Sequence, residues 1–120
     1  MTTSQWVIVF FVDRPGHSPI VDFLGGLDAR TQARFAWSIE QLRTRNTRAH
    51  EPLVRHVEDK IWELREESQT NIYRLLYCFA SGRRIVILHG FQKKTQKTPR
   101  NEIVLAHQRL VKFMAGQGGE

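Results

Sequence analysis

Unbroken apolar runs mark the expected strands of this chain. Residues 6–12 (WVIVFFV) form a β-branched and aromatic run, which is typical of a strand covered on both faces. Residues 72–80 and 84–91 are similar runs, and Ser81-Gly82 between them favours a turn. The pattern predicts an N-terminal strand and a later antiparallel hairpin.

Helix signals fill the gap between these strands. Ser18 followed by Pro19 is typical of an N-cap with proline at the first helical position, and Asp28 is a second N-cap candidate. Behind Asp28, apolar residues recur on one helix face: Phe35, Ile39 and Leu42. We expect two helices packed as a hairpin.

The rest of the second half completes the predicted fold. Residues 54–57 and 60–66 flank a plausible tight turn at Glu58-Asp59, which gives an antiparallel meander of three or four strands. Thr98-Pro99 then starts a closing helix. The fold class is α+β, and we expect the helices on one face of a curved sheet. Residues 1–114 are predicted as one domain and residues 115–120 as a frayed tail.

Composition excludes several classes of protein. The single cysteine, Cys78, rules out an internal disulfide framework and a cysteine-based zinc site, and we expect it to be a buried, inert thiol. The longest apolar run is far shorter than the roughly 20 residues of a membrane span. It also lacks the flanks of a secretory signal. The five histidines show no metal-ligand spacing, so no metal or cofactor is expected. The simplest compartment is the cytoplasm.

The positive charge is concentrated in parts of the chain. The net charge is +6, and residues 71–100 contain seven basic residues and no acidic one. Tyr73, Tyr77 and Phe91 lie in the same window. One interpretation is a solvated basic face; the other is a surface that binds nucleic-acid phosphates.

Strand alternation places three charged residues together. If Trp62 and Leu64 face the helices, then a carboxylate and two guanidinium groups project from the other face: Glu63, Arg65 and Arg74. An ordinary cross-strand ion pair is the alternative. Residues 92–100, which join the last strand to the closing helix, add four cations: Lys93, Lys94, Lys97 and Arg100. The helix start would add to their attraction for phosphate, although soluble loops rich in lysine are common.

Three motifs in order resemble a known group of proteins. They are W-E-L-R at residues 62–65, N-I-Y-R-x-x-Y at 71–77 and H-G-F-x-K-K-T-x-K-T-P at 89–99. Together they are similar to the phage-derived, HigB-like branch of the RelE/ParE toxin superfamily, from about Trp6 to Phe113.

The resemblance implies a type II toxin that is neutralised by a helix-turn-helix, Xre-type antitoxin, with possible higher-order complexes on operator DNA. RelE and HigB members cleave mRNA, typically in the ribosomal A site, without a metal. The alternatives on the same fold are a ParE-like gyrase poison and an inactive relative that only binds its antitoxin and DNA.

The resemblance also assigns residues. Arg74 aligns with the catalytic arginine that contacts the scissile phosphate, and Arg65 with a basic position of the preceding strand. Lys93 and Lys94 match phosphate ligands after the last strand, with Lys97 and Arg100 beside them. Tyr73 could stack on a base or fill the core, as could Tyr77. RelE proper uses lysines on the second strand, where this chain has Glu63. Glu63 is therefore a candidate general base or a sign of a different proton-transfer scheme, and His56 is the competing base.

Overall fold

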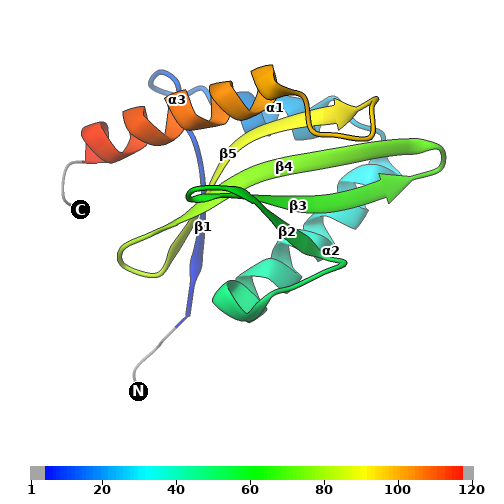
Figure 1. The fold of residues 1–120 in the computed structure, drawn as a ribbon, viewed down its shortest axis with the longest axis horizontal. Helices are drawn as coiled ribbons and strands as arrows, with labels where there is room; N and C mark the ends of the chain where they lie inside the picture. Colours follow the sequence, from blue (N-terminus) through cyan, green and yellow to red (C-terminus); the bar gives the residue numbers. More distant parts are fainter. Residues whose placement is uncertain (1–4, 118–120) are drawn as a thin grey trace.

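A computed structural model describes residues 5–117. The elements follow in this order: strand β1 (Val7–Phe10), helices α1 (Pro19–Gly25) and α2 (Ala29–Arg45), 3-10 helix η1 (Asn46–Arg48), strands β2 (Val54–Glu58), β3 (Ile61–Ser68), β4 (Asn71–Ala80) and β5 (Arg84–Lys93), and helix α3 (Arg100–Gln117) (Figure 1). This confirms the predicted α+β class and element order. Helix α3 ends at Gln117, within the tail predicted for residues 115–120, and that tail stays a prediction. Residues 118–120 of that tail lie outside the described residues.

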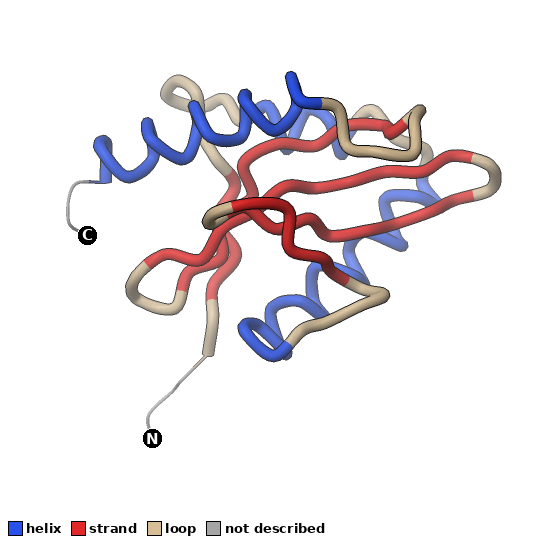
Figure 2. Tube along the Cα trace, in the orientation of Figure 1, coloured by secondary structure: helices blue, strands red, loops and turns tan. Residues whose placement is uncertain are grey.

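The strands form one sheet in the order β1-β5-β4-β3-β2. Strands β2 to β5 make the expected antiparallel meander (Figure 2). Strand β1 joins the sheet beside β5 in parallel, with Val7 opposite Arg84. In the described part of the chain, no helix is long and apolar enough to cross a membrane.

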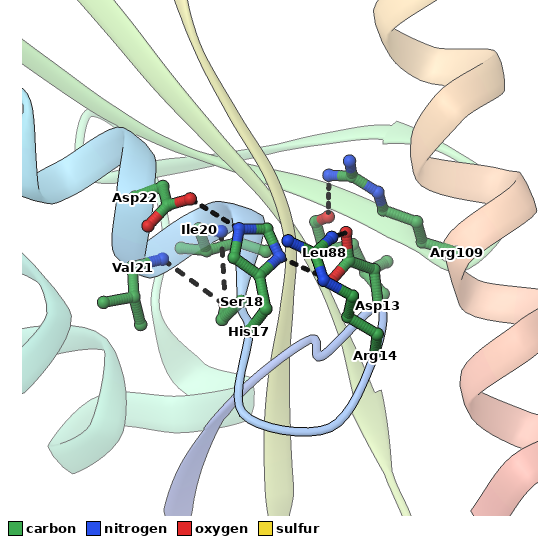
Figure 3. Close-up of polar contacts among 9 residues, drawn as sticks. All are labelled: Asp13, Arg14, His17, Ser18, Ile20, Val21, Asp22, Leu88 and Arg109. Carbon is green, nitrogen blue, oxygen red and sulfur yellow. Dashed lines mark hydrogen bonds and ion pairs between the residues drawn. The ribbon is translucent and has the colours of Figure 1, made fainter.

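The N-caps predicted at Ser18 and Asp28 are confirmed, whereas the one predicted at Thr98 is wrong, because α3 begins at Arg100 and the Thr98 hydroxyl donates to Glu63. The Ser18 hydroxyl accepts the N–H groups of Ile20 and Val21, and the Asp28 carboxylate accepts that of Thr31 at 2.8 Å. In the loop before α1, His17 donates its ring N–H groups to Asp13 at 2.6 Å and to Asp22 at 2.5 Å (Figure 3). The hydrogen bond to Asp13 is the main reason that the pKa of His17 is raised. These contacts fix where α1 begins.

Helices α1 and α2 cover one face of the sheet. Phe23 of α1 and Phe35 of α2 both meet the Tyr73 ring edge-on, with ring centroids 6.4 and 6.1 Å away. Gly90 of β5 allows this approach, because a Cβ atom there would lie 2.5 Å from the Phe23 ring. The Tyr73 side of the sheet is therefore closed by aromatic packing.

Helix α3 lies on the opposite face, so the expectation that all helices share one face is wrong. Glu102 of α3 lies 2.5 Å from the His89 ring nitrogen. Arg109 of the same helix donates to the Leu88 carbonyl at 2.9 Å (Figure 3). The physical reason is visible in β5, where residues 85–88 are all buried. A strand that is apolar on both sides needs a cover on both sides.

Candidate functional site

Two arginines lie directly opposite each other on the α3 face of the sheet. Arg65 of β3 is in register with Arg74 of β4, which in turn is in register with Phe91 of β5. Residues paired in this way point to the same side of a sheet. Because Tyr73 faces α1 and α2, its neighbour Arg74 faces the other way. Glu63, two residues before Arg65, shares that side, as the alternation predicted.

These strands form the floor of a cationic groove. Its volume is about 810 Å³, and its cationic lining residues in the described part of the chain are Arg55, Arg65, Arg74, Lys93 and Lys94. A smaller hollow of about 230 Å³ adjoins it and is lined by Glu63, Lys97 and Thr98 as well as by Arg55 and Lys93. Both hollows lie at the end of the sheet where the loop after β5 leads into α3.

Arg74 and Glu63 form a buried pair at the centre of this region. Each is 3% exposed, and Arg74 Nε lies 3.6 Å from Glu63 Oε2. One terminal nitrogen of Arg74 donates to the Tyr73 carbonyl at 2.9 Å. Burial lowers the pKa of Arg74 from its ordinary value, and the nearby Glu63 carboxylate opposes that effect.

Two buried donors beside the groove make no hydrogen bond. Within residues 5–117, the buried Nε atoms of Arg65 and Arg74 have no hydrogen-bond partner. Buried donors normally have a hydrogen-bond partner, so two neighbouring donors without one are a mark of a binding site for an acceptor. Guanidinium groups with free N–H donors bind carboxylate or phosphate oxygens well.

Glu63 connects the two arginines to the loop after β5. Its Oε1 accepts the Thr98 hydroxyl at 3.0 Å, and its Oε2 also lies 4.0 Å from Arg65 Nε. One carboxylate therefore lies near two guanidinium groups and holds the loop against the sheet. Sequence reasoning missed this role of Thr98, which was interpreted only as a helix cap.

Lys93 resembles Arg74 in that burial lowers its pKa. It is half-buried, and burial is the main reason that its pKa is lowered, followed by the positive charge of Arg74. Lys94 and Lys97 are exposed on the loop. A lysine with a lowered pKa exchanges protons more readily near neutral pH than an exposed lysine does.

Comparison with known families adds a decisive observation. The family model for phage derived protein Gp49-like (DUF891) matches residues 22–111, which include every groove residue named above. The chain belongs to this family. Gp49-like proteins are toxin-like. No curated protein matches the chain.

Two of the predicted site residues of this Gp49-like chain lie away from the groove. Tyr73 is 6% exposed and packed under α1 and α2, so it fills the core rather than offering a stacking surface. His56 is in register with Trp62, with the two ring centroids 4.9 Å apart, and its Nε2 lies 2.7 Å from the Asp59 carbonyl. That ring is therefore turned to the side opposite Arg74, although its residue borders the smaller hollow.

Arg100 is already paired. It makes two hydrogen bonds to Glu58, at 2.6 and 2.9 Å, and His107 of α3 reaches the same carboxylate at 2.9 Å. Arg100 and His107 together lower the pKa of Glu58 to about 2. In the described part of the chain, Glu58, Asp59 and His107 form the group with metal-ligand spacing, but these hydrogen bonds already occupy Glu58. The cluster holds α3 to the β2–β3 turn.

Arg55 is a groove residue that sequence reasoning missed. It is in register with Glu63 and lines both hollows. The alternation that placed Glu63 would also have placed Arg55 on the same side, once the register of β2 was known.

Proposed function

We propose that this Gp49-like protein is a type II toxin of the RelE/HigB kind that cleaves mRNA on the ribosome. The observation that supports it most strongly is the pair of in-register arginines, Arg65 and Arg74, which line a cationic groove and whose buried Nε donors make no hydrogen bond. Such a groove suits a polyanion, and two forked cations suit a single phosphate.

The proposed reaction needs no metal. The ribose 2′-OH attacks the adjacent phosphate, the bond from phosphorus to the 5′-oxygen breaks, and the products carry a 2′,3′-cyclic phosphate and a 5′-hydroxyl. The pentacoordinate phosphorane in between carries extra negative charge. Arg74 and Arg65 would stabilise that charge with preorganised donors, which is the largest contribution in many enzymes.

Two proton transfers complete the proposal. Glu63 is the better-placed of the two candidate bases, since it lies beside Arg74 whereas the His56 ring faces the other side. It would accept the 2′-OH proton. Lys93, with its lowered pKa, would give a proton to the departing 5′-oxygen.

The proposal extends to the setting of the protein. A cytoplasmic toxin of this kind would be held inactive by a helix-turn-helix antitoxin of the Xre type. The adjacent reading frame is the simplest place to look for it. The pair would also bind its own operator DNA as a larger complex.

Expression in bacteria tests the proposal. Wild-type protein should arrest growth, and primer extension on mRNA from arrested cells should show new cleavage ends. Arg74→Ala, if soluble and folded by circular dichroism, should relieve both effects. A matched control, Arg48→Lys on the exposed η1 helix, should stay toxic. Arrest with DNA damage and without new mRNA ends would contradict the nuclease and favour a gyrase poison. A soluble, folded Arg74→Ala protein that is still toxic would overturn the site assignment.

A further inference from the structure

A tryptophan is exposed on the outer face of α2. Trp37 is 60% exposed, whereas Trp6 and Trp62 are half-buried. It lines a shallow hollow of about 480 Å³ together with Arg34, about one helical turn before it, and Arg30, about two turns before it. Exposed aromatic rings flanked by arginines are typical of surfaces that stack on nucleic-acid bases.

Shared lining residues connect this hollow to the cationic groove. A third hollow, at the outer edge of β3, shares Arg34 and Glu66 with the Trp37 hollow. It shares Arg65 and Glu67 with the groove. Strand β2 pairs with β3 as far as Leu64, and the Leu53 carbonyl accepts the Arg65 N–H at 2.9 Å. Beyond that point, no strand within residues 5–117 pairs with this edge of β3. A single strand of RNA leaving the groove can therefore pass over this edge onto α2.

The charges along this path suit a phosphate backbone. Two acidic residues lie at the crossing, Glu66 and the exposed Glu67. The Glu66 carboxylate accepts Arg34 Nε at 3.1 Å and the Ser38 hydroxyl. The Arg34 side chain remains 52% exposed. The crossing therefore presents the accessible Arg34 guanidinium group beside a Glu66 carboxylate that is already paired, and Arg65 beside the exposed Glu67.

We propose that Trp37 is a base-stacking subsite for single-stranded RNA whose backbone runs from the Arg65–Arg74 groove over the edge of β3 to α2. This inference rests on the proposed function, because it extends the same RNA-binding groove. Continuity with the groove favours RNA over an apolar partner protein as the occupant.

The test compares a short and a long oligonucleotide. The probes are 2′-O-methyl oligoadenylates, a trinucleotide and an octanucleotide, which lack the attacking 2′-OH and stay intact. Affinity is measured at one fixed salt concentration by anisotropy, and stacking by quenching of tryptophan fluorescence. The variants are Trp37→Ala, Trp37→Phe and, as a matched control on the distant α3, Val111→Ala, which removes an equally exposed apolar side chain.

Wild-type protein should bind the octanucleotide more tightly than the trinucleotide, with quenched fluorescence. Trp37→Ala should weaken octanucleotide binding roughly 5- to 100-fold and leave the trinucleotide unaffected. Trp37→Phe should retain most of the affinity, and Val111→Ala should match wild type. Equal octanucleotide affinity in Trp37→Ala and wild type would overturn the inference, even if mRNA cleavage stands. A Trp37→Ala variant that keeps its RNA affinity but loses affinity for a partner protein would also overturn it, and would make this face a protein-docking surface. Trp37-dependent binding without any mRNA cleavage would support the subsite and overturn the nuclease.

Discussion

Arg65 and Arg74 lie side by side in register on β3 and β4, with one carboxylate, Glu63, close to both. Like charges directly opposite each other destabilise a sheet. One carboxylate offsets only part of that cost and leaves excess positive charge in a partly buried place. A phosphate placed between the two guanidinium groups would neutralise it, which is why this pair is central to the proposed function.

Glu63→Gln tests how far the pair depends on its carboxylate. The substitution keeps the shape but leaves buried Arg74 without its counter-charge, so the free energy of unfolding should fall by about 3 kcal/mol in urea titrations. Glu67→Gln, on an exposed residue of the same groove, is the control and should change stability by less than about 0.5 kcal/mol. Equal stability of both variants would show that Glu63 does not hold Arg74.

Lys93→Arg separates proton donation from charge. Arginine keeps the positive charge but does not give up a proton, so cleavage should fall about a hundredfold while RNA affinity is kept. In wild type, cleavage should decline as pH rises through the lowered pKa of Lys93, and this decline should vanish in the variant. Lys94→Arg, on the exposed neighbour, should behave as wild type. A pH profile that is the same in Lys93→Arg and wild type would assign the proton to another group.

The Glu58 cluster predicts a dependence of stability on acid. The pKa of the Glu58 carboxyl group in the folded protein is about 2, below its ordinary value of 4.5. The contacts of Glu58 with Arg100 and His107 therefore stabilise the fold above about pH 4.5. That contribution is lost as pH falls from 4.5 towards 2. The difference in urea midpoint between wild type and Glu58→Gln should therefore be largest near pH 6 and shrink towards about pH 2. A difference that does not change with pH would mean that Glu58 acts by packing alone.

Gly90 tests the close approach of α1 to the sheet. A Cβ atom there would meet Phe23 at 2.5 Å and Leu75 at 2.8 Å, so Gly90→Ala should lower the free energy of unfolding by about 1–3 kcal/mol. Gly25→Ala is the matched control, since nothing lies within 4 Å of its added Cβ, and it should be neutral or slightly stabilising. Thermal unfolding of the two variants gives the comparison.

Local signals explain why so much of the fold could be predicted. Ser18 and Asp28 were identifiable as N-caps because each supplies its own side-chain acceptor within a few residues. Alternation placed Glu63, Arg65 and Arg74 on one face because it depends only on strand geometry. Both kinds of signal are short-range.

The rest depended on pairings between distant residues. Nothing local indicates that β1 joins β5 in parallel, or that Arg55 of β2 lies opposite Glu63 on the adjacent strand β3. Arg100 pairs with Glu58, which lies some forty residues earlier in the chain. That partner could not be predicted locally, so the sequence indicated that Arg100 was available to bind phosphate. The unbroken apolar run of β5 already indicated cover on both faces, but which helix covers which face depends on contacts between distant residues.

The termini of the cleaved RNA test the central claim most directly. Purified protein is added to ribosomes programmed with one mRNA, and the new 5′ ends are ligated with and without prior kinase treatment. Attack by the 2′-OH predicts 5′-hydroxyl ends that are ligated only after kinase treatment. Arg74→Lys, which keeps the charge but loses the fork, should cut their yield per unit time about a hundredfold, and Arg48→Lys should not. Ends that carry a 5′-phosphate, or an equal rate in Arg74→Lys and wild type, would contradict the account.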